Sequence, residues 1–158
     1  KKYICGYARA MLKAGFLYST SEEHEAFIAF KSSKESLGFG AVSELIKAVI
    51  RTMRFRDMIK LVKLAKKGGE SYEDSLKKAK KPYVFVGMLV VRRKYQGQGY
   101  MRKVLDIAYE EGKKLGCPVL LDTDAALKRD KYVHLGMKNV RTRKFDEGIV
   151  LYDLAKED

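Results

Sequence analysis

The sequence predicts a mixed α/β fold in which helices flank one central sheet. A nearly continuous apolar run at 83–91 has the length and composition of a strand that is covered on both faces. The segment 100–115 places apolar residues at helical spacing, and a short apolar strand is expected at 118–122. Because strand and helix patterns alternate along 158 residues without a linker, we expect a single domain over 1–158.

The remaining elements follow from periodicity and from turn and capping residues. Ser43 is the expected N-cap of a long helical segment, and Ser71, with Asp74 in the first turn, is the expected N-cap of a short one. The short polar joint at 21–23 predicts a hairpin. The predicted elements are helices at 4–14, 44–67, 71–80 and 125–135, strands at 15–20, 24–31, 138–141 and 149–153, and a loop at 34–40.

The composition restricts the environment and the class of site. No apolar run approaches the ~20 residues of a membrane-spanning helix, so no membrane partner is expected. Cys5 and Cys117 are the only cysteines, which favours a reducing compartment and a cytoplasmic protein over a disulfide framework. His24 and His134 have no cluster of ligands around them, so no metal site is expected.

The net charge is +13, from 33 basic and 20 acidic residues, and its densest block is 44–67. That block holds eight basic and two acidic residues, interleaved with apolar ones. It fits a solvated helix face or a docking surface for an acidic partner. The chain contains no zinc-finger spacing, aromatic RNP-type strand or Arg/Gly tract, so nucleic acid is not expected as a partner.

A basic, glycine-containing turn at 92–99 joins the predicted strand to the following helix. Glycines allow close backbone approach, and free N–H groups at a helix N-terminus attract phosphate. The turn lacks the third glycine of a Rossmann motif and the Gly-Lys-Ser/Thr of a P-loop. Gly97 and Gly99 would also suit a plain tight turn, so the glycines alone leave both interpretations open.

The segment from Val91 to Met101, VRRKYQGQGYM, resembles the acetyl-CoA motif Gln/Arg-x-x-Gly-x-Gly/Ala of GNAT-type N-acetyltransferases. Gln96 and Gly99 match the motif, whereas Met101 replaces its small final residue. Further along, 121–125, Tyr132 and Leu-Gly-Met at 135–137 resemble the second half of the family's cofactor region. Lys128 stands where the family has Asn, and the resemblance covers about 83–153.

The resemblance implies a GNAT-like, largely antiparallel central sheet flanked by helices. A helical insertion would occupy about 44–81, before the cofactor-binding strand, and the usual N-terminal strand and helix would be shortened or missing before Gly15. It also implies acetyl-CoA as cofactor and Tyr132 as the general acid that protonates the departing CoA thiolate. The implied cofactor-binding residues are Leu89, Val90, Val91, Gln96, Gly97, Gln98, Gly99, Tyr100, Met101, Arg102 and Lys128.

The implied activity is direct transfer of an acetyl group to a primary amine of a small molecule or peptide, and a homodimer stays open. Glu25 and Asp122 are the candidates for the base. Positive charge from Lys47, Arg51 and Arg54 near the acceptor would suit an acceptor that bears carboxylate or phosphate. The alternatives are a non-catalytic CoA-binding module, with Tyr132 an ordinary helix residue, and a basic module that binds nucleic acid or an acidic partner.

Overall fold

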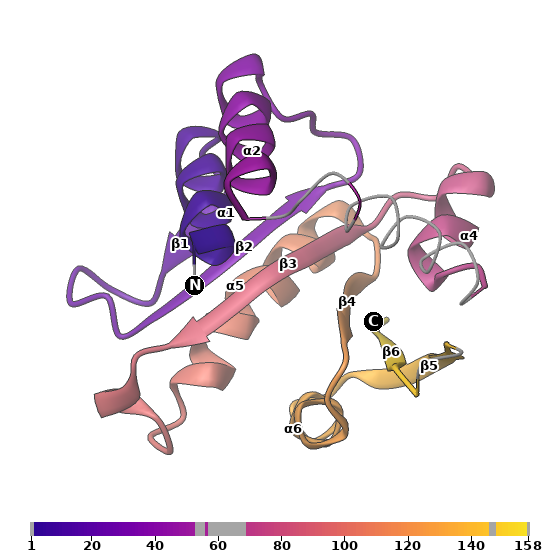
Figure 1. Cartoon of the computed structure of the whole chain (residues 1–158). Helices are drawn as coiled ribbons and strands as arrows, with labels where there is room; N and C mark the ends of the chain where they lie inside the picture. Colours follow the sequence, from indigo (N-terminus) through magenta and orange to yellow (C-terminus); the bar gives the residue numbers. More distant parts are fainter. Residues whose placement is uncertain (1, 53–55, 57–68, 146–147, 158) are drawn as a thin grey trace.

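A computed structural model describes residues 2–52, 56, 69–145 and 148–157, and within them six strands form one sheet in the order β1-β2-β3-β4-β6-β5 (Figure 1). The elements are α1 (Lys2–Lys13), β1 (Leu17–Ser19), β2 (Ala26–Ser32), α2 (Phe39–Thr52), α4 (Tyr72–Lys78), β3 (Val84–Val91), the 3-10 turn η1 (Arg93–Tyr95), α5 (Tyr100–Leu115), β4 (Val119–Thr123), α6 (Ala126–His134), β5 (Lys138–Lys144) and β6 (Val150–Lys156).

The sheet is mixed and largely antiparallel, which confirms the predicted fold class. Strands β3 and β4 form its parallel pair, and the other neighbours are antiparallel. The parallel pairing is short, since it joins Val84 to Val119 and Phe85 to Leu120 and then stops. Beyond this point the two strands diverge, as Figure 1 shows. The divergence leaves an opening in the middle of the sheet.

A β-bulge at Gly87 accompanies this divergence. Met88 pairs with Ala29 and Val86 pairs with Phe30, so Gly87 is an extra residue on β3. A bulge bends its strand and increases the local twist. The hydroxyl of Tyr7, from α1, occupies the place that a Cβ at position 87 would need. A side chain at position 87 would therefore require the end of the Tyr7 side chain to move aside.

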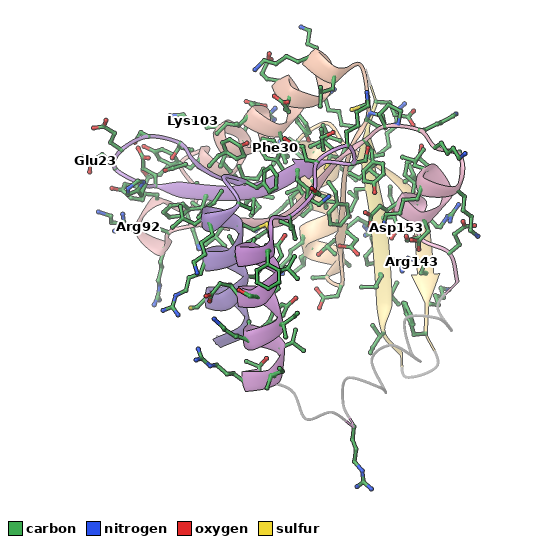
Figure 2. The ribbon with its side chains drawn as sticks, turned by 90° about the horizontal axis from the view of Figure 1, so that it is seen from above. Glu23, Phe30, Arg92, Lys103, Arg143 and Asp153 are labelled. Carbon is green, nitrogen blue, oxygen red and sulfur yellow. The ribbon has the colours of Figure 1, made fainter. Side chains whose placement is uncertain are left out.

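Helices cover both faces of the sheet. On one face, Val104, Leu105 and Ala108 of α5 pack against apolar side chains of β2, β3 and β4. On the other face, α1 and α2 pack over Ala29 and Met88, and α4 covers a smaller cluster that includes Leu120. Figure 2 places Phe30 near the centre of the molecule. Among the described helices, none has the length and apolar character needed to cross a membrane.

Several sequence predictions are confirmed at the level of single residues, and one cap is wrong. Ser71 caps α4 in a capping box with Asp74, as predicted. Helix α2, however, begins at Phe39, and Ser43 lies inside it with its hydroxyl donating to the carbonyl of Gly40 at 2.8 Å. The helical pattern predicted at 53–55 and 57–68 lies outside the described residues.

Candidate active site

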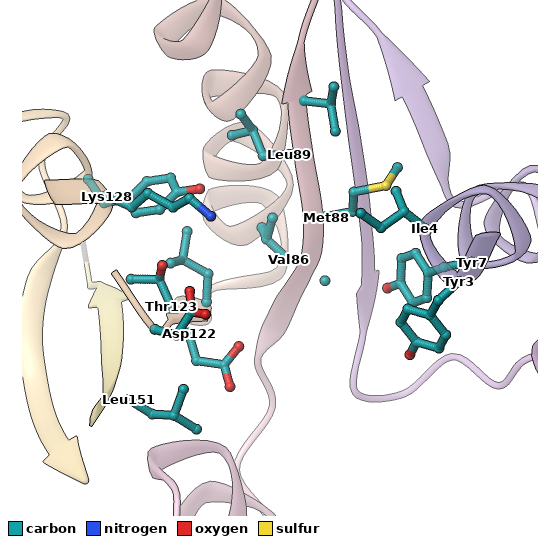
Figure 3. A pocket seen from close by; sticks show the side chains of 15 residues that line it. Tyr3, Ile4, Tyr7, Val86, Met88, Leu89, Asp122, Thr123, Lys128 and Leu151 are labelled. Atoms are coloured by element: carbon teal, nitrogen blue, oxygen red, sulfur yellow. The ribbon is translucent and has the colours of Figure 1, made fainter. Parts of the chain in front are cut away.

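A cleft of about 710 Å³ lies where β3 and β4 separate (Figure 3). One wall comes from α1 and β3, and the other from β4, α6 and β6. Figure 3 shows Tyr3, Ile4 and Tyr7 on the first side, across from the polar groups of the second. The lining residues are Tyr3, Ile4, Tyr7, Val86, Gly87, Met88, Leu89, Val90, Leu121, Asp122, Thr123, Asp124, Lys128, Tyr132 and Leu151.

The cleft has an end on each face of the sheet. Leu121 and the ring of Tyr132 belong to the core under α5. Asp122 follows Leu121 on the strand, so its side chain projects to the opposite face, toward α1 and α4. A molecule that passes between β3 and β4 would therefore meet Tyr132 on one side and Asp122 on the other.

Tyr132 presents a protonated hydroxyl to this cleft. Its ring packs against the core, and burial raises the pKa of its phenol above the ordinary value. No hydrogen-bond partner of the hydroxyl is found among the described residues. A neutral, unpaired phenol in a cleft has the properties of a proton donor.

The turn after β3 offers a row of open backbone amides. Gly97 and Gly99 adopt left-handed backbone angles, with φ of 78° and 80°. Within the described residues, the N–H groups of Gly97, Gln98, Gly99, Tyr100 and Met101 have no hydrogen-bond acceptor. Successive amides at a helix N-terminus form an anion-binding site. The donor set therefore fits a pyrophosphate.

Side chains brace the turn from both ends. The side-chain amide of Gln96 donates to the backbone carbonyl of Val91 at 3.2 Å. The side-chain amide of Gln98 donates to the backbone carbonyl of Lys94 at 2.9 Å. Arg92 donates to the carbonyl of Glu23 at 3.0 Å and so joins the turn to the β1–β2 hairpin. Figure 2 shows Glu23 and Arg92 together, at the end of the molecule remote from Arg143 and Asp153. The turn is thus held in shape before any ligand binds.

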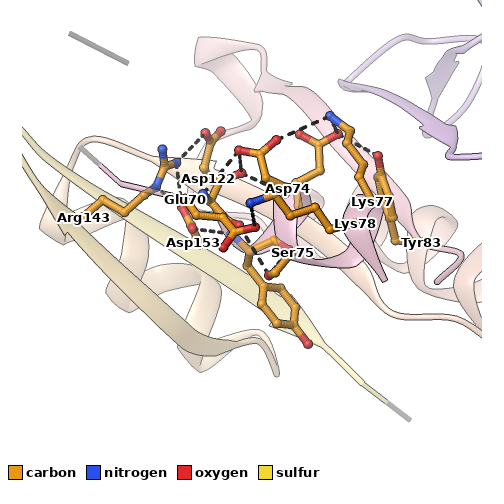
Figure 4. A network of polar contacts seen from close by, with 12 residues as sticks. Glu70, Asp74, Ser75, Lys77, Lys78, Tyr83, Asp122, Arg143 and Asp153 are labelled. Atoms are coloured by element: carbon orange, nitrogen blue, oxygen red, sulfur yellow. Dashed lines mark hydrogen bonds and ion pairs between the residues drawn. The ribbon is translucent and has the colours of Figure 1, made fainter. Parts of the chain in front are cut away.

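Behind the wall of the cleft that carries Asp122 lies a buried ion pair (Figure 4). Asp153, which is 4% exposed, accepts hydrogen bonds from Arg143 at 3.0 and 2.8 Å and from the backbone amide of Tyr72 at 2.8 Å. The same guanidinium lies 3.6 Å from the carboxylate of Asp122. Asp122 is thereby connected to three elements, β5, β6 and α4.

The two candidate bases have opposite environments. The carboxyl of Asp122 has a raised pKa, because the surrounding protein desolvates it more strongly than Arg143 stabilises its charge. Glu25 does not line the cleft. The hydroxyls of Ser21 and Thr20 donate to its carboxylate at 2.7 Å and lower its pKa to about 2. Glu25 is therefore a hairpin-stabilising residue, and Asp122 is the candidate that faces the cleft.

The predicted catalytic and cofactor-binding residues occupy three places in the structure. Leu89, Val90, Lys128 and Tyr132 line the cleft together. The residues from Gln96 to Arg102 lie in the turn and the first turn of α5, outside the cleft lining. Val91 packs against the core and accepts the hydrogen bond from Gln96.

Two of the three residues predicted to give the acceptor a positive wall do not line the cleft. Lys47 and Arg51 line a separate groove between α1 and α2, together with Arg9 and Glu44. Arg54 lies outside the described residues. Sequence reasoning also missed Tyr3 and Tyr7, whose spacing places them on one face of α1. The isolated glycine in an apolar strand was the available signal for the bulge that Tyr7 contacts.

The sequence profile of the acetyltransferase (GNAT) family matches residues 66–135, which include β3, the glycine turn, α5, β4 and α6. The region that matches is thus the one that carries the open amides and Tyr132. These residues identify this region of the chain as a GNAT acetyltransferase region. GNAT proteins of this family are acyltransferases that use acetyl-CoA. No curated protein matches the chain.

Solved structures share this GNAT fold. Arylalkylamine N-acetyltransferase 2 from Aedes aegypti superposes with a TM-score of 0.60 at 14% identity, covering 96% of this chain and 77% of that one. A polyamine N-acetyltransferase from Drosophila melanogaster gives 0.57 at 10% identity, covering 96% and 79%. At these identities the likeness concerns the fold.

Proposed function

We propose that this GNAT protein transfers the acetyl group of acetyl-CoA directly to a primary amine. The observation that carries the proposal is the cleft between β3 and β4, which has Tyr132 toward one face of the sheet and an acceptor-accessible wall toward the other. Such a cleft allows the two reactants to approach each other from opposite faces. Holding them in this way removes much of the entropic cost of a bimolecular reaction.

The chain supplies binding groups that suit the two ends of the cofactor. The open amides from Gly97 to Met101 would hold the pyrophosphate, with Arg102 adding positive charge. The β4-facing edge of β3 at Leu89, Val90 and Val91 would hydrogen-bond the pantetheine arm, and Lys128 would lie beside it. When bound, acetyl-CoA supplies the acyl group as a thioester.

Two groups of the chain would assist the transfer. A backbone N–H of β3 near Leu89 would stabilise negative charge that develops on the carbonyl oxygen. The hydroxyl of Tyr132 would donate its proton to the departing sulfur and recover one from solvent afterwards. Burial keeps this phenol protonated at neutral pH, as the role requires.

Release of free thiol from acetyl-CoA, measured with a panel of primary amines, tests the proposal. We expect amine-dependent thiol release by the wild-type protein. Binding of acetyl-CoA without thiol release by any amine would instead support the non-catalytic CoA-binding alternative. Absence of acetyl-CoA binding by the folded protein would overturn both.

A further inference from the structure

We propose that the acceptor is a protonated amine on an uncharged apolar body, and that Asp122, positioned by Arg143, binds its ammonium group and takes its proton. This inference rests on the proposed acetyl transfer and deepens it by naming the substrate class and the base. The residues that carry it lie on the side of the cleft toward α1 and α4, away from the side assigned to the cofactor.

The local charge of this wall is opposite to that of the protein. The chain carries +13 overall, yet the described residues that line the cleft include two carboxylates, Asp122 and Asp124, and one cation, Lys128. A smaller cavity of about 160 Å³ adjoins the cleft at Leu121 and Asp122. Its charged lining residues are Glu73, Asp74, Asp122, Asp153 and Arg143. This end of the cleft therefore attracts a cation and repels an anionic acceptor.

Asp122 is the carboxylate that this arrangement leaves open to a ligand. Asp153 has both oxygens committed, one to Arg143 and the other to the amide of Tyr72. The Asp122 side chain is 47% exposed and lies 3.6 Å from Arg143, whereas that of Arg143 is 10% exposed. The guanidinium is fixed by Asp153 and so holds Asp122 in place without enclosing it. Arg143 is accordingly a positioning residue.

The opposite wall provides an apolar surface for the rest of the acceptor. Tyr3, Ile4 and Tyr7 of α1 face the carboxylates across the cleft, with Met88 of β3 beside them (Figure 3). Tyr3 and Ile4 are 45% and 56% exposed, so their apolar area is available for contact. Burial raises the pKa of Tyr7 to about 12, which keeps this wall uncharged. A flat or aliphatic group attached to the amine fits between the walls.

Residues on the two faces of the sheet accept and donate protons during the transfer. The ammonium gives one proton to the Asp122 carboxylate, and the freed lone pair attacks the thioester carbon. As the C–N bond forms and the C–S bond breaks, the nitrogen loses a second proton to solvent and the sulfur takes one from Tyr132. Solvent restores Tyr132 and deprotonates Asp122, so one proton is released for each amide formed.

The substrate class is tested with 2-phenylethylamine and phenylalanine, which differ by one carboxylate beside the amine. With thiol release as the readout, we expect kcat/KM to be about tenfold or more higher for 2-phenylethylamine, because the acidic wall repels the carboxylate. Equal or faster acetylation of phenylalanine, or of an acidic peptide, would overturn the proposal while leaving acetyl transfer intact.

The role of Asp122 is tested by Asp122→Asn, with Asp106→Asn on the exposed face of α5 as a matched charge control. Asp122→Asn is expected to lower kcat about 10²-fold or more and to abolish the acidic limb of the pH–rate profile, while acetyl-CoA binding measured by calorimetry stays unchanged. The charged groups that act on the carboxyl of Asp122 are Arg143, Asp153 and Glu73, and Asp124 and Lys128 also line the cleft. Arg143→Lys is expected to shift the limb to higher pH, because a less well-fixed cation stabilises the carboxylate less.

The outcomes separate the proposals. Retained activity and an unchanged acidic limb in Asp122→Asn would overturn the assignment of the base. Loss of acetyl-CoA binding in the wild-type protein would overturn the acetyl transfer itself, and this inference with it. Direct binding of 2-phenylethylamine to the CoA-saturated protein, weakened in Asp122→Asn, supports the ammonium contact independently of turnover.

Discussion

The hydroxyl of Tyr7 occupies the space above Gly87 that any larger residue would fill. This relationship connects the first helix of the chain to the bulge in β3, and the bulge lies where β3 departs from β4. The wall of the cleft formed by α1 and the bulge in β3 therefore meet at this contact.

Gly87→Ala is expected to displace Tyr7 and to disturb both the bulge and the acceptor wall. We predict a loss of up to about 1 kcal/mol in the free energy of unfolding, because the end of the Tyr7 side chain can move aside, and a lower kcat/KM for the amine. Denaturant unfolding and thiol release check the two effects. Gly38→Ala is the control, because no atom lies within 4 Å of a Cβ at that position. A Gly87→Ala protein with both wild-type stability and wild-type kcat/KM would contradict the contact.

Gly99→Ala and Gly116→Ala place the same change at the two ends of α5. Both glycines have positive φ, 80° and 59°, so each substitution should cost about 1 kcal/mol of stability. Only Gly99→Ala is expected to weaken acetyl-CoA binding, because only the N-terminal turn carries the open amides. Calorimetric titration measures the affinity, and equal affinities in the two variants would argue against the turn as the pyrophosphate site.

Tyr132→Phe is expected to slow turnover about 10²-fold without loss of stability. Its hydroxyl has no partner among the described residues, so its removal leaves no buried group unsatisfied. Tyr109→Phe is the matched control, since the Tyr109 hydroxyl donates to the carbonyl of Leu135 at 3.2 Å. That variant should lose about 1 kcal/mol of stability and keep its turnover. The opposite pattern would assign Tyr132 a structural role.

Glu25 makes the free energy of unfolding depend on pH. Its pKa is about 2 in the folded protein, below the ordinary value of 4.5, because Ser21 and Thr20 donate to the carboxylate. The stabilisation is present above the unfolded pKa and is lost as the pH falls from about 4.5 toward about 2. Glu25→Gln should therefore lower stability at neutral pH and flatten this part of the stability–pH curve. Denaturant unfolding at several pH values measures both, and parallel curves would refute the role.

Much of the fold could be predicted because its elements carry local signals. The apolar spacing of α5, its C-terminal glycine and the Ser71 cap with Asp74 each depend on neighbouring residues alone. Ser43 misled the prediction because a serine is also tolerated within a helix, where its hydroxyl donates to a carbonyl three residues back. Strand β5 continues to Lys144, three residues past the predicted end, because it is an exposed edge strand that lacks apolar alternation.

The candidate site was predictable only where its residues are close in the sequence. The turn at Gln96–Gly99 and the position of Tyr132 belong to continuous motifs. Asp122 was a candidate base from the sequence, but its contact with Arg143 is long-range, as are those between Tyr7 and Gly87 and between Arg143 and Asp153. Strand β3 differs from its prediction for the same reason. Its apolar run predicted a strand covered on both faces, but part of it is exposed. Val90 is 40% exposed, because this half of the strand borders the cleft.

Calorimetric titration of acetyl-CoA into the purified protein tests the central claim most directly. The proposed function predicts saturable binding to one site, retained in Tyr132→Phe and abolished in Gly99→Glu, whose carboxylate would stand before the open amides of the turn. No binding by the well-folded wild-type protein, or undiminished binding by a well-folded Gly99→Glu, would contradict the assignment of the turn and the cleft to the cofactor.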